Sequence, residues 1–228
     1  MEAIADDVWG VSGAARMPGG VVFPLRMTVI RLPDGGLWLH SPVAIDDATA
    51  REIEALGPVR HLVAPSLLHD LHSGAAKARW PEARLHAPAA LRARRPDLPI
   101  DEDLSDGRSW GDAVVALAIR GAPKLDEFEF LHRPSRTLLV TDLVFHVLAP
   151  VTFATKLVLC GAGCHGRLGS SRAWRWVFAQ DRAAVAASVE RILALDFDRL
   201  VPAHGEVIPR GAAPALRHAL SQALSWRR

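Results

Sequence analysis

The sequence has few cysteines, no long hydrophobic run and no basic leader, and each absence excludes a class of protein. Its 228 residues include two cysteines, Cys160 and Cys164, too few for the disulfide framework of a small secreted protein. The longest uncharged apolar stretch, residues 143–155, contains Pro150 and is much shorter than the roughly 20 residues that cross a bilayer. Residues 1–7 are acidic rather than basic, unlike a signal peptide. We therefore expect a cytoplasmic protein that is not bound to a membrane.

Concentrated positive charge is also lacking. The 27 basic and 25 acidic residues leave a formal net charge of +2, and the basic residues are scattered rather than gathered into the stripe that nucleic-acid binding requires. We expect a small-molecule substrate and no nucleic acid. Half of the residues are hydrophobic and 23% are charged, a composition typical of globular proteins. The length predicts one domain over residues 1–228, and nothing in the sequence specifies an oligomeric state.

The hydrophobic pattern predicts strands in the first third of the chain and mixed strands and helices after it. Val8–Val11 begins as a strand, and the turn sequence at residues 33–36 predicts a hairpin. The Arg- and Pro-rich segment 92–108 is expected to be an exposed excursion. This order indicates a sheet-rich α/β core flanked by helices rather than a doubly wound parallel sheet. The predicted strands are residues 27–32, 37–40, 59–64, 85–87, 113–119, 127–132, 137–140 and 198–204, and the clearest helices are residues 48–56 and 181–195.

Three polar clusters directly follow predicted buried strands. They are the segment His69-Asp70-Leu71-His72, Asp142 and His204. Loops beyond strand ends are where α/β folds place functional groups, and imidazole and carboxylate are ligands that zinc accepts, with iron and manganese as alternatives. Each cluster also has a structural interpretation: Asp142 as a helix cap, His204 as a turn residue, and His69 with His72 as one exposed helical face.

The same segments resemble a known superfamily. Thr141-Asp142-Leu143-Val144-Phe145 is similar to the Gly-Asp-Leu-Leu-Phe segment of metallo-β-lactamase-fold hydrolases, and residues 200–205 are similar to their late Pro-Gly-His-Gly segment. Longer runs at residues 26–32, 39–42 and 132–143 resemble a bacterial family of unknown function related to that superfamily. The resemblance implies a single-domain αββα four-layer sandwich in which the aspartate and the late histidine bind metal.

The histidine-rich first motif of the superfamily is incomplete in this chain. In one register, Ser66, Leu68 and Leu71 occupy its histidine positions and Asp70 occupies its aspartate position. A shift by one residue instead places His69 and His72 on two histidine positions. The superfamily's mid-chain histidine falls near Ala122, which cannot bind metal. Glu127 is either a substitute oxygen ligand or a strand-edge residue.

These observations lead to one leading hypothesis and two others. The first is a metal-dependent hydrolase of a small ester, thioester or lactone, with one divalent metal, zinc before iron or manganese, held by His69, His72, Asp142 and His204. Asp70 would position or deprotonate the water. The alternative is a non-catalytic protein of the same fold that binds a small ligand or a protein partner. An iron protein with redox chemistry ranks last, because its ligand set is less complete.

Overall fold

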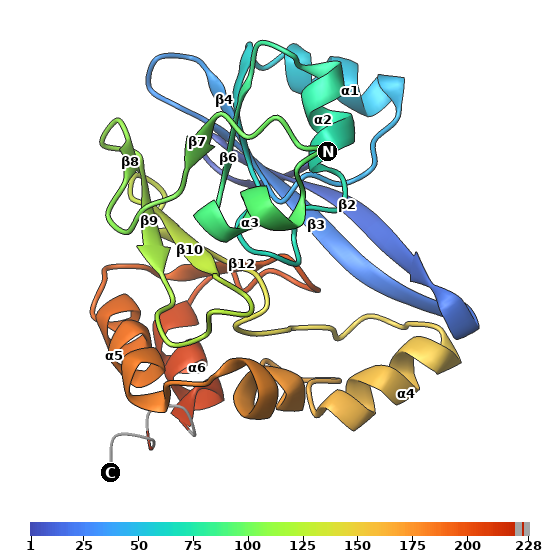
Figure 1. Ribbon diagram of the computed structural model, residues 1–228, viewed down its shortest axis with the longest axis vertical. Helices are drawn as coiled ribbons and strands as arrows, with labels where there is room; N and C mark the ends of the chain where they lie inside the picture. Colours follow the sequence, from blue (N-terminus) through green and yellow to red (C-terminus); the bar gives the residue numbers. More distant parts are fainter. Residues whose placement is uncertain (222–224, 226–228) are drawn as a thin grey trace.

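The computed structural model describes residues 1–221 and residue 225, and it shows two β-sheets packed face to face with helices on their outer sides (Figure 1). The first sheet has the order β1-β2-β3-β4-β5-β6-β7 and the second has the order β12-β11-β10-β9-β8. The strands of the first sheet are β1 (Glu2–Ala5), β2 (Val8–Met17), β3 (Val21–Arg31), β4 (Leu37–His40), β5 (Val59–Val63), β6 (Arg84–Ala87) and β7 (Glu102–Asp103). Those of the second are β8 (Ser109–Trp110), β9 (Val114–Ala118), β10 (Phe128–His132), β11 (Thr137–Val140) and β12 (Arg199–Pro202).

Three apolar interfaces separate four layers. Helices α1 (Asp47–Glu54), α2 (Ser73–Arg79) and α3 (Ala89–Arg94) bury side chains against the first sheet. Helices α5 (Arg182–Leu193) and α6 (Ala212–Ala219) do the same on the second sheet. Between the sheets lies a third cluster that includes several aromatic rings. The expected αββα sandwich is therefore confirmed.

The period-two alternation of the strands explains why each sheet can be buried on both faces. In β11, Leu139 packs between the sheets, whereas Leu138 and Val140 pack against the helices. Successive side chains of a strand point to opposite faces, so a continuous apolar strand such as Thr137–Val140 requires a covering layer on each side. A sheet of this kind is stable only within a layered sandwich.

The directions of the strands bring several loops to one edge of the sandwich. β4 and β5 are parallel in the first sheet, and β11 and β12 are parallel in the second. The carboxyl ends of parallel neighbours lie at the same edge. The loops that follow β5, β11 and β12 carry the polar residues singled out in the sequence, and the fold brings His69, Asp142 and His204 together.

Two expectations about the fold need correction. Residues 92–108 are not wholly an exposed excursion, because Leu98, Ile100 and Leu104 are buried. The hairpin predicted across residues 33–36 is present as β3 and β4, but the strands at residues 8–11 and 27–32 are longer than predicted. They form a second hairpin, in which β2 and β3 pair from Val8 with Ile30 to Met17 with Val21. The tip of this β2–β3 hairpin reaches the helix α4 (Phe153–Ala162) (Figure 1). Small residues and prolines in the outer half of this hairpin conceal the strand pattern. In the described part of the chain, no helix combines the length and the apolarity needed to cross a bilayer.

Candidate metal centre

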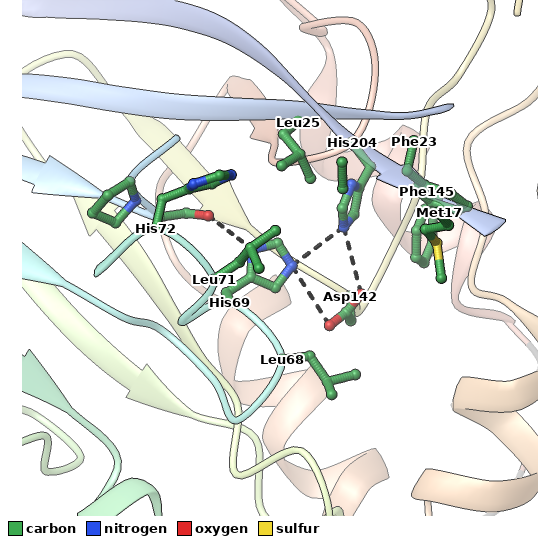
Figure 2. A pocket seen from close by; sticks show the side chains of 13 residues that line it. Met17, Phe23, Leu25, Leu68, His69, Leu71, His72, Asp142, Phe145 and His204 are labelled. Carbon is green, nitrogen blue, oxygen red and sulfur yellow. Dashed lines mark hydrogen bonds and ion pairs between the residues drawn. The ribbon is translucent and has the colours of Figure 1, made fainter. Parts of the chain in front are cut away.

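Three side chains from three loops converge at the carboxyl edge of the two sheets. His69, Asp142 and His204 each offer one ligand atom, and these atoms lie within 4.8 Å of one another. The two histidine Nε2 atoms are 3.2 Å apart. The Nε2 of His69 lies 3.6 Å from Oδ2 of Asp142, and that of His204 lies 3.6 Å from Oδ1 (Figure 2). Two imidazoles and a carboxylate form a donor set suited to zinc.

The position of Asp142 is fixed by a buried glutamate behind it. Glu127 Oε1 accepts hydrogen bonds from the Thr141 hydroxyl at 2.5 Å and from the Leu143 amide at 2.9 Å. Its other oxygen accepts from Trp174 Nε1 at 3.1 Å. Glu127 therefore holds the residues on both sides of Asp142 and does not belong to the three-donor group. It lies directly before β10, as the strand-edge interpretation expects, and outside the donor group.

His204 follows β12 on a backbone that requires glycine at the next position. Gly205 has a φ of 103°, and a Cβ there would lie 2.0 Å from the carbonyl oxygen of His146. The amide of His146 donates to the carbonyl of His204 at 3.0 Å, so the two chain segments are in close contact. The glycine lets the loop turn back at this contact while the imidazole points into the site.

Hydrogen bonds on the far side of each ring orient both imidazoles. His204 Nδ1 lies 2.9 Å from the carbonyl oxygen of Pro24. Because a carbonyl only accepts, Nδ1 carries the proton, and Nε2 of the neutral ring presents its lone pair to the site. His69 Nδ1 bonds the Ser41 hydroxyl at 2.8 Å. The ring of His204 also stacks on Phe145, with centroids 4.8 Å apart.

Ser41 and the Pro24 carbonyl were missed in the sequence as parts of the site. Ser41 directly follows β4 and adopts a φ of 53°, a conformation that non-glycine residues rarely occupy and that often marks functional sites. The run Leu39-His40-Ser41-Pro42 carried the family resemblance, and it was the available signal for Ser41. A backbone carbonyl such as that of Pro24 leaves no signal in a sequence.

The electrostatics of the group favour a bound cation. Burial alone would raise the pKa of Asp142, but His69 and His204 lower it below its ordinary value. Burial lowers the pKa of His69, and the Asp142 carboxylate reverses this, so the net pKa is raised. Among the described residues, Asp142 Oδ2 has no hydrogen-bond partner although it is buried. A buried carboxylate oxygen in this condition is costly, and a cation between the three donors would satisfy it.

Asp70 and His72 lie outside this group. The Asp70 carboxylate forms an ion pair with Arg95 and does not line the cavity in front of the three donors. His72 is the N-cap residue of α2 and lines the cavity, but Figure 2 shows it apart from His69, Asp142 and His204. Burial lowers its pKa. The structure thus unites three of the four expected metal ligands and places the expected base in an ion pair.

A cavity of about 280 Å³ opens in front of the three donors. The β2–β3 hairpin forms one wall, and the loops after β4, β5, β11 and β12 form the others (Figure 2). Its lining residues are Ala15, Met17, Phe23, Leu25, Ser41, Pro42, Leu68, His69, Leu71, His72, Asp142, Phe145 and His204. A small molecule in this cavity would touch the donor group directly.

Comparison with known proteins supports the fold and leaves the activity open. Residues 5–91, less than half of the chain, match the family described as Domain of unknown function (DUF4336). No curated protein matches the chain significantly. Among solved structures, the metallo-β-lactamase DIM-1, exposed to ceftazidime, is similar with a TM-score of 0.69 and 13% identity over 98% of this chain and 95% of that one.

Two further solved structures are similar to this chain over nearly its full length. FIM-1 from Pseudomonas aeruginosa, a metallo-β-lactamase in a mono-zinc form, is similar with a TM-score of 0.66 and 16% identity, over 98% of this chain and 95% of that one. TMB-1 is similar with a TM-score of 0.69 and 12% identity, over 100% of this chain and 97% of that one. The chain therefore has the metallo-β-lactamase fold, and the resemblance found in the sequence is confirmed. At such low identities the likeness establishes the fold alone.

Proposed function

We propose that the protein is a metal-dependent hydrolase of a small ester, thioester or lactone, with one divalent ion held by His69, Asp142 and His204. The observation that carries the proposal is the convergence of these three donors at the base of an open cavity. Three protein ligands with a remaining open position are typical of catalytic zinc sites. A mono-zinc form of the similar FIM-1 structure is consistent with a single ion on this fold.

The chain's own residues suit this chemistry. When bound, a divalent ion would supply a Lewis acid and would lower the pKa of a coordinated water. Asp142 provides the negative charge that balances the cation, and the Pro24 carbonyl and Ser41 keep the two imidazoles oriented. The apolar wall of the cavity would contact the substrate's acyl portion.

His72 takes the place of Asp70 as the proposed proton acceptor. Apart from the three donors, it is the only titratable side chain among the described residues that line the cavity. Burial lowers its pKa, so its ring is neutral near pH 7 and can accept a proton at a nitrogen. Asp70, held by Arg95 outside the cavity, instead anchors the loop that carries His69.

Metal content tests the proposal directly. We expect about one zinc, iron or manganese ion per chain, measured by elemental analysis of protein purified without chelators or added metal. Asp142→Ala and His204→Ala should each reduce the content well below one. His72→Ala is the matched control, because it removes an imidazole from the cavity wall but not from the donor group, and its content should stay unchanged.

Two results would remove the proposed site. One is a metal content that stays the same in both Asp142→Ala and His204→Ala. The other is a folded protein that carries no metal and takes none up on reconstitution. Hydrolysis of p-nitrophenyl esters, thioesters or lactones by the metal-loaded protein, with loss of this activity in His204→Ala, would support the whole proposal of a metal-dependent hydrolase.

One observation favours the alternative of a non-catalytic binding protein. Leu68 and Leu71, which carry no metal donor, line the cavity where the superfamily motif has histidines in one register. A cavity lined in this way can bind a small apolar ligand without a metal. A folded protein without metal that still binds such ligands would establish the alternative.

A further inference from the structure

The cavity in front of the donor group is apolar except at its base. The hairpin contributes Met17, Phe23 and Leu25, and the loop after β5 contributes Leu68 and Leu71. Met17, Leu68 and Leu71 are 54%, 44% and 62% exposed. Single exposed apolar side chains are ordinary, but a cluster at the mouth of a cavity indicates a surface that a ligand covers.

Positive charge is missing from the same surface. No lysine or arginine is among the described residues that line the cavity. Three arginines adjoin the site residues. Arg16 lies between Ala15 and Met17 in β2, where successive side chains point to opposite faces, and it does not line the cavity. The other two are occupied elsewhere. Arg26 donates to the carbonyl of Gly205 and pairs with Glu2, and Arg95 pairs with Asp70 and Asp97. A carboxylate on the ligand's apolar portion would lie against apolar side chains here without a cation to pair with, which is unfavourable.

The size of the cavity limits the ligand further. A cavity volume of about 280 Å³ suits a small molecule rather than a segment of a polymer. The base of the cavity offers polar and metal-binding groups at one end only. The ligand therefore has one polar reacting end and an uncharged tail.

We propose that the substrate is an uncharged carboxylic ester or lactone with a short apolar chain, and that the site discriminates against analogues whose chain ends in a carboxylate. This specificity rests on the proposed hydrolase function for its catalytic step. Its binding preference is a property of the cavity walls and can be measured separately.

The three methionines provide a reporter inside the protein. Met17 lines the cavity, whereas Met27 is buried in the core of the first sheet and lines a neighbouring cavity that shares Pro42 and His72 with the first. Methionine methyl groups labelled with carbon-13 can be followed by NMR while methyl hexanoate or monomethyl adipate is added. The two probes share an ester, and the second ends in a carboxylate. Met17→Leu assigns the reporting signal by its disappearance.

Methyl hexanoate should shift the Met17 signal at concentrations at least tenfold lower than monomethyl adipate, and the Met27 signal should stay in place. Leu71→Lys adds a cation at the rim and should reduce or reverse the preference. Leu157→Lys is the matched control, because Leu157 is exposed on α4 outside the cavity. Equal binding of both probes, tighter binding of the adipate, or a shift confined to Met27 would overturn the proposal.

Hydrolysis by metal-loaded protein separates this proposal from the function it rests on. Faster turnover of p-nitrophenyl butyrate than of p-nitrophenyl hydrogen succinate supports both. Turnover that favours the succinate overturns the specificity and leaves the hydrolase standing. No turnover of either ester, together with neutral-probe binding at Met17, overturns the hydrolase and leaves the ligand preference in place.

Discussion

At the scale of single residues, the site depends on a carboxyl group that never touches the cavity. Glu127 is fully buried, and burial raises its pKa, with a further increase from Asp142. It nevertheless accepts hydrogen bonds from Thr141, Leu143 and Trp174. These bonds offset part of the cost of burying the carboxyl. The conformation of the Asp142 loop is thus maintained by a residue whose importance comes from its position and not from its reactivity.

Replacement of Glu127 should therefore impair both stability and metal binding. Glu127→Ala leaves three buried donors unpaired and should lower the free energy of unfolding by roughly 3 kcal/mol, with a fall in metal content. Glu127→Gln keeps the Oε1 acceptor for Thr141 and Leu143 and loses only the bond from Trp174. Its losses of stability and of metal content should therefore both be smaller. Urea unfolding and elemental analysis measure the two effects.

The exposed Glu82 provides the control for this prediction. Glu82→Ala should change the unfolding free energy by less than about 0.5 kcal/mol. If Glu127→Ala proved as mild as Glu82→Ala and kept full metal content, Glu127 would not be the support of the Asp142 loop.

At the scale of elements, the long β2–β3 hairpin connects the cavity to α4. Buried Thr155 on α4 accepts from the Val22 amide at 2.8 Å and donates to the Val22 carbonyl at 3.1 Å. The same hairpin supplies a wall of the cavity and the Pro24 carbonyl that orients His204. Docking of the hairpin on α4 therefore also stabilises the geometry of the site.

Thr155→Val should loosen this docking without changing the volume of the side chain. The variant loses the two hydrogen bonds to Val22 and the one to the Thr152 hydroxyl at 2.8 Å, which should cost about 1 kcal/mol locally. The Val22 amide should then exchange with solvent roughly fivefold faster in native-state hydrogen exchange. The Leu139 amide, in the interior strand β11, is the internal control and should keep its rate. An unchanged rate at Val22 would show that α4 does not hold the hairpin.

Elements that carry a strong local pattern were predictable, and those that depend on distant partners were not. The apolar runs of β5 and β11 and the capped helix that follows Asp46 appear where the sequence predicts them. The outer half of the β2–β3 hairpin could not be predicted, because Ala14, Ala15 and Pro24 have low strand propensity. Pairing along the whole hairpin and the contact with α4 stabilise it instead.

The same distinction holds for the site when the whole molecule is considered. Strand-end position singled out His69, Asp142 and His204, because parallel strands end at a common edge. Strand-end position could not separate His69 from Asp70 or His72. Only the path of the loop decides which of these three neighbours points toward Asp142 and His204. The single-domain assignment of residues 1–228 stays a prediction.

Buried neutral histidines should set the response of the whole molecule to acid. Burial is the main cause that lowers the pKa of His40 and of His86 from 6.5 to about 3. Both stay neutral in the folded protein, whereas the unfolded chain binds protons near pH 6.5. The unfolded state therefore gains protons as the pH falls, and stability decreases. Between pH 7.5 and pH 5 each histidine should remove about 2 kcal/mol.

His86→Leu removes one of these titrating groups from a fully buried position, together with its contact with His61. The slope of unfolding free energy against pH, measured by urea titration between pH 6 and pH 5, should fall by up to about 1.4 kcal/mol per pH unit. His69 acts in the opposite direction, since its raised pKa favours the folded state at low pH, but it is present in both proteins and cancels in the comparison. Equal slopes for the two proteins would mean that His86 binds its proton in the folded state as readily as in the unfolded chain. Its burial between His61 and Glu102 would then not keep the ring neutral.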